Sequence, residues 1–342
     1  MADLEHSMPD FFELLRCPVT HQRLSVSSDG GSLIDSSGRN RYPIRYGIPD
    51  FRQFDPPYMT RAEESALAGE IASASETMSY DQLIEHYERT LHPTTRPLHE
   101  VESSIEHRRL LRKRASGRLE YLLKATEGRT APRGLTLDLG CGSGEASSAL
   151  LESGARKVIG IDISLVELML ARKLLGELGL PHQLVAGCAE AMPFPDGMFD
   201  FIYSPDVIEH VADQTAYLAE VARTLAPGGD VLLNSPNRFS VVCPEPHVGL
   251  WFVTFLPRQL ISPACRLFGR GRYIGKRLLS LSELRQVVRR TFAEHEIFWR
   301  RSNPQANSLP GRIFYLTRSV SETVFAHVCD QHVVLARKSS TP

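Results

Sequence analysis

The fold is decided by residues 135–164, which read LTLDLGCGSGEASSALLESGARKVIGIDIS. An apolar run, Leu135–Leu139, breaks at once into the glycine-rich segment 140–144, and this predicts a strand that ends in a tight turn. The residues after the turn suit a helix, and residues 157–161 form a second β-rich run that ends at Asp162. The stretch therefore predicts two parallel strands joined by a right-handed helical crossover.

The turn carries residues that suit a charged nucleoside. Glycines let the backbone approach a ligand closely, and an acid at the end of the second strand accepts hydrogen bonds from both ribose hydroxyls. Gly140, Gly142 and Gly144 follow the spacing G-x-G-x-G, which differs from the dinucleotide fingerprint G-x-G-x-x-G. Asp138 precedes them inside an otherwise apolar strand, where a carboxylate is costly unless a polar or cationic group meets it. A ligand with a ribose and positive charge would satisfy both acids.

Five segments resemble, in order, the successive motifs of class I S-adenosylmethionine-dependent methyltransferases; they are LDLGCGSGEAS, VIGIDIS, AEAMPFPDGMFDFIYS, DVIEHV and LAPGGDVLL. Together they span residues 135–234. The resemblance implies S-adenosylmethionine as the cofactor. It also implies an α/β fold, a Rossmann-like seven-stranded mixed sheet with helices on both faces and an antiparallel last strand. The motifs identify the superfamily and say little about the methyl acceptor.

The strand ends and the resemblance together predict the residues that bind the cofactor. These are Asp138, Gly140, Cys141, Gly142, Gly144, Asp162, Ile163, Cys188, Ala189, Glu190 and Ser204. Relatives commonly have an aspartate where Cys188 stands, and it contacts the adenine amino group. We therefore expect adenine recognition here to rely on backbone groups around Cys188 and Ala189. Ser204 closes the fourth strand, whose carboxyl end should face the methionine part of the cofactor.

Composition sets limits on partners and compartment. The 342 residues carry a net charge of -1, so nucleic-acid binding would have to rest on local basic patches. Six cysteines are scattered along a sequence without a signal-peptide pattern, which favours reduced thiols in the cytoplasm. The longest apolar run, residues 248–256, is too short to span a bilayer.

Residues 1–57 predict a small hairpin-rich module, because short β-type runs alternate with Ser, Gly and Asn turns. The segments LLRCPVT and RYPIRYGIPDF resemble small zinc-ribbon-like domains that occur alone in bacteria or fused to methyltransferases. In that pattern two C-x-x-C pairs hold zinc. This chain keeps only Cys17, has Thr20 at the partner position and has no cysteine at 34–37, so we expect the fold without the metal. The module either docks the substrate or only packs.

Residues 58–130 are rich in Glu, Ala, Leu and Arg and predict a helical lid or linker, broken near residues 92–97 by prolines. A homodimer could form through this segment or through the N-terminal module. Residues 107–118, HRRLLRKRASGR, concentrate positive charge. This cluster is either a solvated helix face or a surface for phosphate or RNA.

Residues 131–342 form the predicted methyltransferase domain. Within it Asp206, Glu209 and His210 are a tempting chemical cluster, since a similar arrangement binds a divalent ion in some O-methyltransferases. Helical spacing, however, would place Glu209 and His210 on different faces. We therefore expect no metal and treat His210 as a candidate catalytic residue that faces the substrate.

A substrate-side insertion at about residues 235–280 is unusually long, and long insertions in compact domains are often functional. Its aromatic run, residues 248–256, predicts an apolar flap above the methyl donor, which suits a hydrophobic acceptor and excludes water. His247 precedes this run and is the first candidate general base. The arginines that follow either hold an acidic substrate or solvate the flap. The polar segment 301–321 predicts another loop on the active-site side.

The sequence favours an S-adenosylmethionine-dependent methyltransferase that modifies an O, N or C nucleophile of a small, partly apolar metabolite. A quinone-like or other secondary-metabolite acceptor fits this description. One alternative is an rRNA or tRNA methyltransferase, suggested by the N-terminal module and the basic clusters. Another is a non-catalytic binding partner that retains the fold. The donor is already activated, so no residue of the protein is obliged to act as a catalyst.

Overall fold

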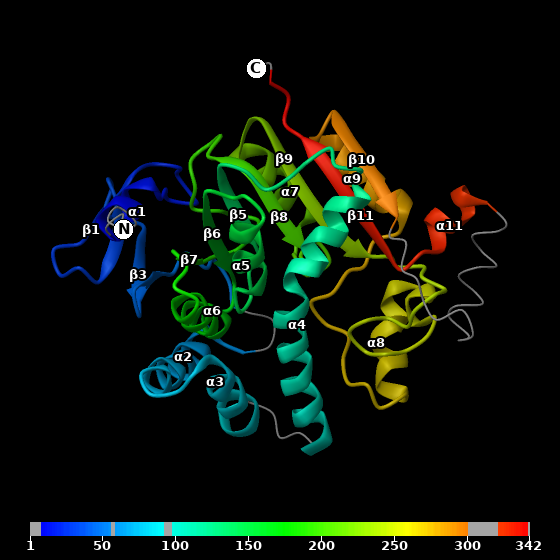
Figure 1. Ribbon diagram of the computed structural model, residues 1–342, viewed down its shortest axis with the longest axis horizontal. Helices are drawn as coiled ribbons and strands as arrows, with labels where there is room; N and C mark the ends of the chain where they lie inside the picture. The colour runs from blue at the N-terminus through cyan, green and yellow to red at the C-terminus, as the bar shows by residue number, and fades with distance from the viewer. Residues whose placement is uncertain (1–7, 56–58, 92–97, 300–320, 341–342) are drawn as a thin grey trace.

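The computed structural model describes residues 8–55, 59–91, 98–299 and 321–340. Within these ranges no helix has both the length and the apolar character needed to cross a membrane. A large α/β unit occupies the centre and a small β-rich module lies beside one edge of its sheet (Figure 1).

The central sheet has seven strands in the order β10-β11-β9-β8-β5-β6-β7. The five strands from β5 to β9 pair parallel with one another, whereas β11 pairs antiparallel with both β9 and β10. The predicted seven-stranded mixed sheet is confirmed. The strands are β5 Leu135–Leu139, β6 Lys157–Asp162, β7 Gln183–Ala186, β8 Phe199–Pro205, β9 Leu225–Pro236, β10 Glu294–Trp299 and β11 Gln331–Arg337.

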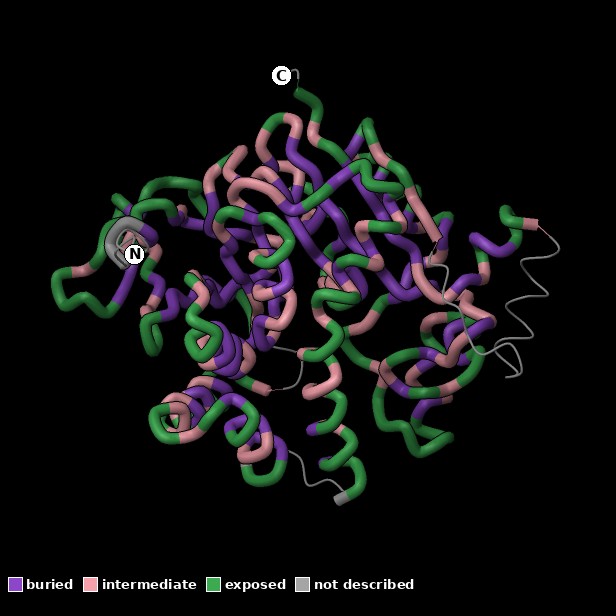
Figure 2. Tube along the Cα trace, in the orientation of Figure 1, coloured by how far each residue is buried: buried purple, intermediate pink, exposed green. Residues whose placement is uncertain are grey.

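Helices cover both faces of this sheet. Three lie on one face: α4 Leu98–Ala125, α5 Glu145–Glu152 and α6 Leu165–Glu177. The other face carries α7 Gln214–Thr224 and α9 Leu281–Thr291. A short helix, α11 Glu322–Val328, precedes the last strand. Coverage on both sides explains why the parallel strands are apolar runs rather than alternating ones, and Figure 2 shows them buried along most of their length.

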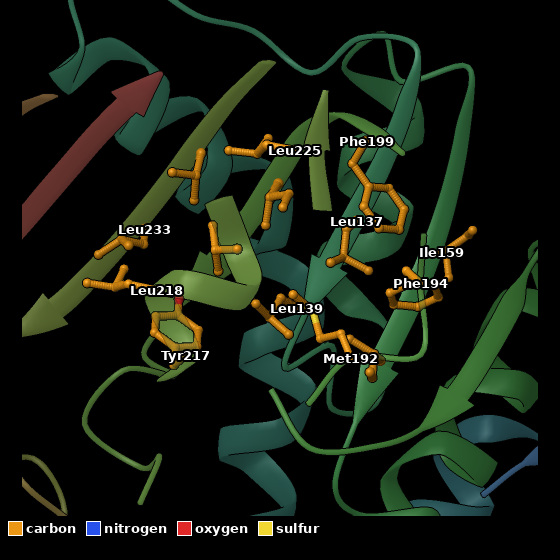
Figure 3. Packing of buried hydrophobic residues seen from close by; sticks show 14 of the residues in the cluster. Leu137, Leu139, Ile159, Met192, Phe194, Phe199, Tyr217, Leu218, Leu225 and Leu233 are labelled. Atoms are coloured by element: carbon orange, nitrogen blue, oxygen red, sulfur yellow. The ribbon is translucent and has the colours of Figure 1, made fainter. Parts of the chain in front are cut away.

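Alternate residues of each strand enter different halves of the core. Leu137 and Leu139 of β5 pack with Tyr217 and Leu218 of α7 (Figure 3). Asp138, which lies between them, faces the opposite side and accepts a hydrogen bond from Ser147 of α5. The strand pattern therefore places an acid against a helix rather than in the apolar cluster.

The N-terminal module forms a four-stranded antiparallel sheet in the order β1-β2-β3-β4, preceded by α1 Met8–Leu14. Its strands are β1 Leu24–Val26, β2 Ser32–Asp35, β3 Arg41–Arg45 and β4 Ile48–Pro49. Cys17 is buried, and its Sγ atom lies 3.1 Å from the Tyr42 hydroxyl. The module continues onto the central sheet, because the Phe51 amide donates to the Ala186 carbonyl at the end of β7.

The next segment is helical, as predicted. It contains α2 Arg61–Ser75, α3 Tyr80–His86 and a single π-helical turn, η1 Tyr87–Leu91, before α4. Capping boxes at Thr60 and Ser79 fix the starts of α2 and α3. The predicted break near residues 92–97 lies outside the described residues, as does the predicted loop at 301–321 apart from its last residue.

The insertion after β9 contains a 3-10 turn, η2 Val253–Phe255, and one helix, α8 Arg258–Leu267. Its small apolar core includes Val248, Ile261 and Cys265. Several large apolar side chains nevertheless remain exposed; they are Trp251, Phe252, Phe255, Leu256, Leu260, Leu267 and Phe268. The insertion is therefore folded but presents an apolar outer surface.

Candidate functional site

A cavity of about 1170 Å³ lies at the carboxyl ends of β5, β6 and β8. Strand β5 has β6 on one side and β8 on the other, so the chain direction of the crossovers changes here. Open α/β sheets bind ligands at such a switch point. Residues from four parts of the chain line the cavity: the end of the N-terminal module, the helical segment, the strand ends and the insertion.

The glycine turn brings the backbone to the cavity wall. Gly140 lines the cavity with a φ of +77°, a value that side chains with a Cβ rarely adopt. A Cβ at this position would lie 2.4 Å from Cγ2 of Val207, which also lines the cavity. A glycine is therefore required at position 140 for the turn. It also allows Val207, in the loop after the neighbouring strand β8, to pack closely against the turn.

Asp162 ends β6 and lines the cavity beside Ile163. One carboxylate oxygen accepts a hydrogen bond from the Gly142 amide at 2.9 Å, and the other accepts one from the Ser164 amide at 2.8 Å. Burial raises the pKa of Asp162 to about 6, in spite of these two bonds. Each oxygen keeps further acceptor capacity, so a ribose with two hydroxyls fits the fixed carboxylate.

Asp138 lies behind the turn and does not line the cavity. It is fully buried, and one of its oxygens accepts a hydrogen bond from the Ser147 hydroxyl of α5 at 2.7 Å. The other oxygen, Oδ1, accepts no hydrogen bond from the described residues. Burial, together with the nearby charges of Asp162 and Glu145, raises the pKa of Asp138 to about 7. A cationic ligand next to the turn would relieve the cost of this carboxylate.

Other predicted cofactor residues divide into two groups. Besides Gly140, Asp162 and Ile163, the cavity is lined by Cys188, Ala189 and Glu190. Cys141, Gly142, Gly144 and Ser204 lie in or behind its wall, where Ser204 accepts a hydrogen bond from the Tyr217 hydroxyl at 2.8 Å. These four residues support the wall in this structure, and their contact with a cofactor stays a prediction.

The N-terminal module takes part in the site through a cluster of buried charges that the sequence did not suggest. Arg52 pairs with Asp50 at 2.8 Å and with Glu64 of α2, and the guanidinium is fully buried. Arg52 also donates to the Ile163 carbonyl at 3.2 Å, while Glu64 accepts a hydrogen bond from Ser164 at 2.9 Å. Arg52 and Glu64 therefore hold the backbone that follows Asp162. Only contacts between distant segments could have revealed this role.

The turn after β8 builds another part of the cavity wall. Asp206 has a φ of +54°; it is held by Arg118 and by the Asn234 side chain, whose amide donates to Oδ1 at 2.6 Å. Glu209 and His210 follow in a turn. The expectation that helical spacing separates them was wrong, because the segment is not helical and their side chains converge with His247, their ligand atoms within 4.8 Å.

His210 lines the cavity, whereas His247 does not. Their Nε2 atoms are 3.2 Å apart, so His247 reaches the cavity only through His210. Burial, together with the nearby charges of His247 and Lys276, lowers the pKa of His210 to about 4, so this imidazole is neutral at pH 7. The catalytic roles predicted for both histidines are untested and stay predictions.

A different part of the insertion faces the cavity from the one the sequence indicated. The cavity is lined by Arg272, Ile274, Gly275, Lys276 and Arg277 and not by the aromatic run 248–256. The expectation of an aromatic flap above the methyl donor was therefore wrong. The aromatic residues pack among themselves or face outward, because α8 and η2 carry them away from the strand ends.

The basic cluster at residues 107–118 lies on α4 and is largely engaged within the chain. Arg108 pairs with Glu88 at 2.8 Å and with Glu167 at 2.6 Å. Arg118 pairs with Asp206 at the cavity. The charges that suggested an RNA surface are therefore used, at these positions, to fasten the helical segment over α6 and the strand ends.

Comparisons with known proteins agree with this geometry. Residues 137–233 match a family described as a methyltransferase domain. A dimethylglycine N-methyltransferase of Parasynechococcus marenigrum is 39% identical over 105 residues, which cover 30% of this chain and 38% of that protein. A ubiquinone biosynthesis O-methyltransferase of Cereibacter sphaeroides is 33% identical over 123 residues, which cover 36% and 49%. The chain thus spans less than half the length of these relatives.

A solved structure of phosphoethanolamine N-methyltransferase 2 from Haemonchus contortus superposes with a TM-score of 0.43 at 19% identity, covering 65% of this chain and 52% of that one. The matched segment contains the glycine turn, Asp162 and the turn that carries Glu209 and His210. Residues 137–233 of this chain therefore match a methyltransferase domain. The cofactor that the sequence predicts for such a domain is S-adenosylmethionine.

The residues present fit this cofactor. Asp162 offers two oriented oxygens to a ribose, and Gly140 leaves the backbone accessible beside them. Cys188 and Ala189 line the part of the cavity predicted to hold the adenine, next to Phe54 of the N-terminal module. The Oδ1 atom of Asp138, which accepts no hydrogen bond from the described residues, lies behind the turn where positive charge is needed.

Proposed function

We propose that this protein is a methyltransferase that transfers a methyl group from S-adenosylmethionine to an O, N or C nucleophile of a small, partly apolar metabolite. The observation that carries the proposal is one continuous cavity with Asp162 at the cofactor end and His210 at the other. Its volume of about 1170 Å³ exceeds the roughly 300–1,000 Å³ that a single ligand usually occupies. The cavity has room for the cofactor and a small acceptor together.

The chemistry of the acceptor end supports a partly apolar, electron-rich acceptor. Val207, Val211 and Ile274 provide apolar lining, and Arg272 and Arg277 provide positive charge. The sequence from 246 to 282 contains six Arg or Lys residues and no Asp or Glu. A quinol-like or phenolic acceptor, apolar in its ring and negative when deprotonated, suits this combination.

In the proposed reaction the protein acts chiefly by position. When bound, S-adenosylmethionine supplies a methyl group on a cationic sulfur, so charge is dispersed during the transfer. Asp162 would orient the ribose, and the apolar residues Val207 and Val211 would exclude water from the acceptor. In-line approach at about 3–3.5 Å accounts for much of the acceleration that such sites provide. His210 lines the same cavity and would accept the acceptor's proton.

The alternative of an RNA substrate is less well supported. Arg108 and Arg118, which belong to the basic cluster on α4, are paired with acids of the same chain. Nucleic-acid binding depends on cations that are free to meet phosphates. The test below includes RNA as one of the acceptors, so the two proposals are separated by one experiment.

The test is incorporation of labelled methyl by the full-length protein. The acceptors are alkylated hydroquinones and catechols, small amines, and total RNA. We expect methylation of a phenolic small molecule, with S-adenosylhomocysteine released in equal amount. Asp162→Asn should weaken cofactor binding by about 1–3 kcal/mol, the scale of a lost hydrogen bond to a charged group. Asp196→Asn, an exposed acid paired with Arg223, should leave both readouts unchanged.

Three outcomes would contradict the proposal. Transfer to RNA in preference to small molecules would favour the nucleic-acid alternative. Cofactor binding by calorimetry without transfer to any acceptor would favour a non-catalytic binding partner. Failure to bind S-adenosylmethionine would remove the assigned cofactor site itself.

A further inference from the structure

Three side chains meet beside the acceptor end of the cavity. Glu209 and His210 come from the turn after β8, and His247 comes from the insertion, 37 residues further on. One ligand atom from each lies within 4.8 Å of the other two. The two imidazole rings meet edge to face, with an interplanar angle of 83° and with their Nε2 atoms 3.2 Å apart.

A carboxylate fixes the tautomer of His247. Its Nδ1 atom lies 2.6 Å from Oε1 of Glu245, and a carboxylate can only accept hydrogen bonds, so the proton is on Nδ1. Glu245 is itself held by the Val248 amide at 2.7 Å and the Tyr273 hydroxyl at 3.0 Å. The Nε2 lone pair of a neutral His247 therefore faces Nε2 of His210 at 3.2 Å, where it can accept a hydrogen bond from that ring or bind a cation. Metal-binding histidines are typically oriented in this way by a carboxylate.

Glu209 supplies a buried acceptor that lacks a donor. The residue is fully buried, and neither carboxylate oxygen accepts a hydrogen bond from another described residue. Asp206 differs, because Arg118 and Asn234 occupy both of its oxygens. A buried carboxylate is costly without a cation or a donor. The cation is thus expected beside Glu209 and the histidines, with Asp206 outside the ligand set.

We propose that Glu209, His210 and His247 bind a divalent transition-metal cation of the Zn²⁺ type next to the acceptor. Two imidazoles and one carboxylate are a known zinc ligand set that leaves a position open. Zn–N bonds of about 2.0–2.1 Å in tetrahedral geometry place two nitrogens about 3.3–3.4 Å apart. The observed 3.2 Å between the Nε2 atoms agrees with this separation.

The site is placed to act on the acceptor. His210 lines the cavity, so the open position of the metal would face the same space. A metal at this position would lower the pKa of an acceptor hydroxyl bound to it, so that the hydroxyl could release its proton to solvent water and the resulting oxygen anion could accept the methyl group. This catalytic role rests on the proposed methyl transfer, whereas the binding of the metal does not. The two histidines would then act as ligands in place of the general bases that the sequence suggested.

The experiment measures metal binding without cofactor or acceptor. Full-length protein is stripped with a chelator and dialysed against Zn²⁺, and bound metal is quantified by mass spectrometry. We expect one tightly bound Zn²⁺, little competition from Mg²⁺, and at least tenfold weaker binding in Glu209→Gln, His210→Asn and His247→Asn. Glu245→Gln should weaken binding by about 10–100-fold, because second-sphere partners of ligating histidines have effects of that size.

A matched control is His327→Asn on α11, an exposed histidine whose ring Nδ1 lies 2.8 Å from the Thr323 carbonyl oxygen. It should bind Zn²⁺ as the unaltered protein does. Co²⁺ substitution gives a second readout, since ligation without thiolates shows visible d–d absorption and no sulfur charge-transfer band. No bound Zn²⁺, equal binding in the three ligand variants, or a thiolate band from the cysteines would each overturn the proposal.

Discussion

Replacement of Arg52 by alanine tests whether the N-terminal module is part of the cofactor site. The Arg52 guanidinium is fully buried between Asp50 and Glu64, and it donates to the Ile163 carbonyl beside the cofactor strand. The variant therefore removes a buried charge that joins the module, α2 and the end of β6. We expect both the stability of the protein and its affinity for S-adenosylmethionine to fall.

The magnitude follows from the burial of the partners. The side chains of Asp50 and Glu64 are 6% and 0% exposed. Removal of one partner from a buried ion pair costs about 3–5 kcal/mol, because the remaining charge stays out of water. Asp50 keeps Arg45 at 3.3 Å, which limits its share of the loss. We therefore expect a decrease of about 3–5 kcal/mol in the free energy of unfolding, borne mostly by Glu64.

Urea unfolding followed by circular dichroism measures the loss, and calorimetry measures the cofactor affinity. Arg41→Ala is the matched control, since its pair with Asp29 is in the same module but more than half exposed, and such pairs contribute about 1 kcal/mol or less. Arg52→Met combined with Glu64→Gln should recover part of the stability because it removes both charges. If Arg52→Ala costs no more than Arg41→Ala, the buried network does not join the module to the site.

Three further outcomes are expected. Affinity for S-adenosylmethionine should rise by up to about tenfold per pH unit as the pH approaches about 6 and level off above it, because the ionised Asp162 carboxylate is a stronger acceptor for the ribose hydroxyls than the protonated acid. Calorimetry between pH 5 and 7.5 checks this, and Asp162→Asn should flatten the profile. Without cofactor, the free energy of unfolding should decrease as the pH rises from about 4 to 7. The reason is that the raised pKa of Asp138 keeps its proton bound in the folded state over this range, whereas the unfolded state has lost it. Asp138→Asn should reduce the slope measured in urea titrations. Gly140→Ala should lower the free energy of unfolding by more than the roughly 1–2 kcal/mol that a left-handed backbone costs a residue with a Cβ, because the new Cβ meets Val207. Gly142→Ala, whose Cβ would enter open space, should lower it only by the backbone part in the same urea titrations.

The central sheet could be predicted because its determinants are local. Thirty residues contain the features that predict it, which are the apolar run Leu135–Leu139, the glycines after it and the acid at 162. They predict in turn a strand, a tight turn and the end of the next strand. The Ser164 cap and the start of α6 were likewise predictable, since the Ser164 hydroxyl accepts from the Glu167 amide only three residues on. Strand ends in a parallel sheet then bring Asp162, Cys188 and Ala189 together without further information.

The remaining parts of the site depend on contacts between distant segments. Arg52 meets Ile163 across 111 residues, and no local pattern distinguishes it from an exposed arginine. His247 meets His210 only because the insertion folds back over the turn after β8. The aromatic run was assigned to the cavity because it is apolar, but an apolar run also suits an outer surface or a small core of its own. Composition alone does not say which face of an insertion meets a cavity.

The two buried charge clusters explain why this cavity has two different ends. At the cofactor end, Arg52 compensates the acids Asp50 and Glu64, so Asp162 is left to accept hydrogen bonds from a ligand. Beside the turn after β8, Arg118 pairs with Asp206. Neither carboxylate oxygen of Glu209 accepts a hydrogen bond from the described residues. The protein thus pairs Asp50, Glu64 and Asp206 with its own arginines, whereas the carboxylate oxygens of Glu209 accept no hydrogen bond from the described residues. The cation proposed above would compensate Glu209 in the way that Arg52 compensates Glu64.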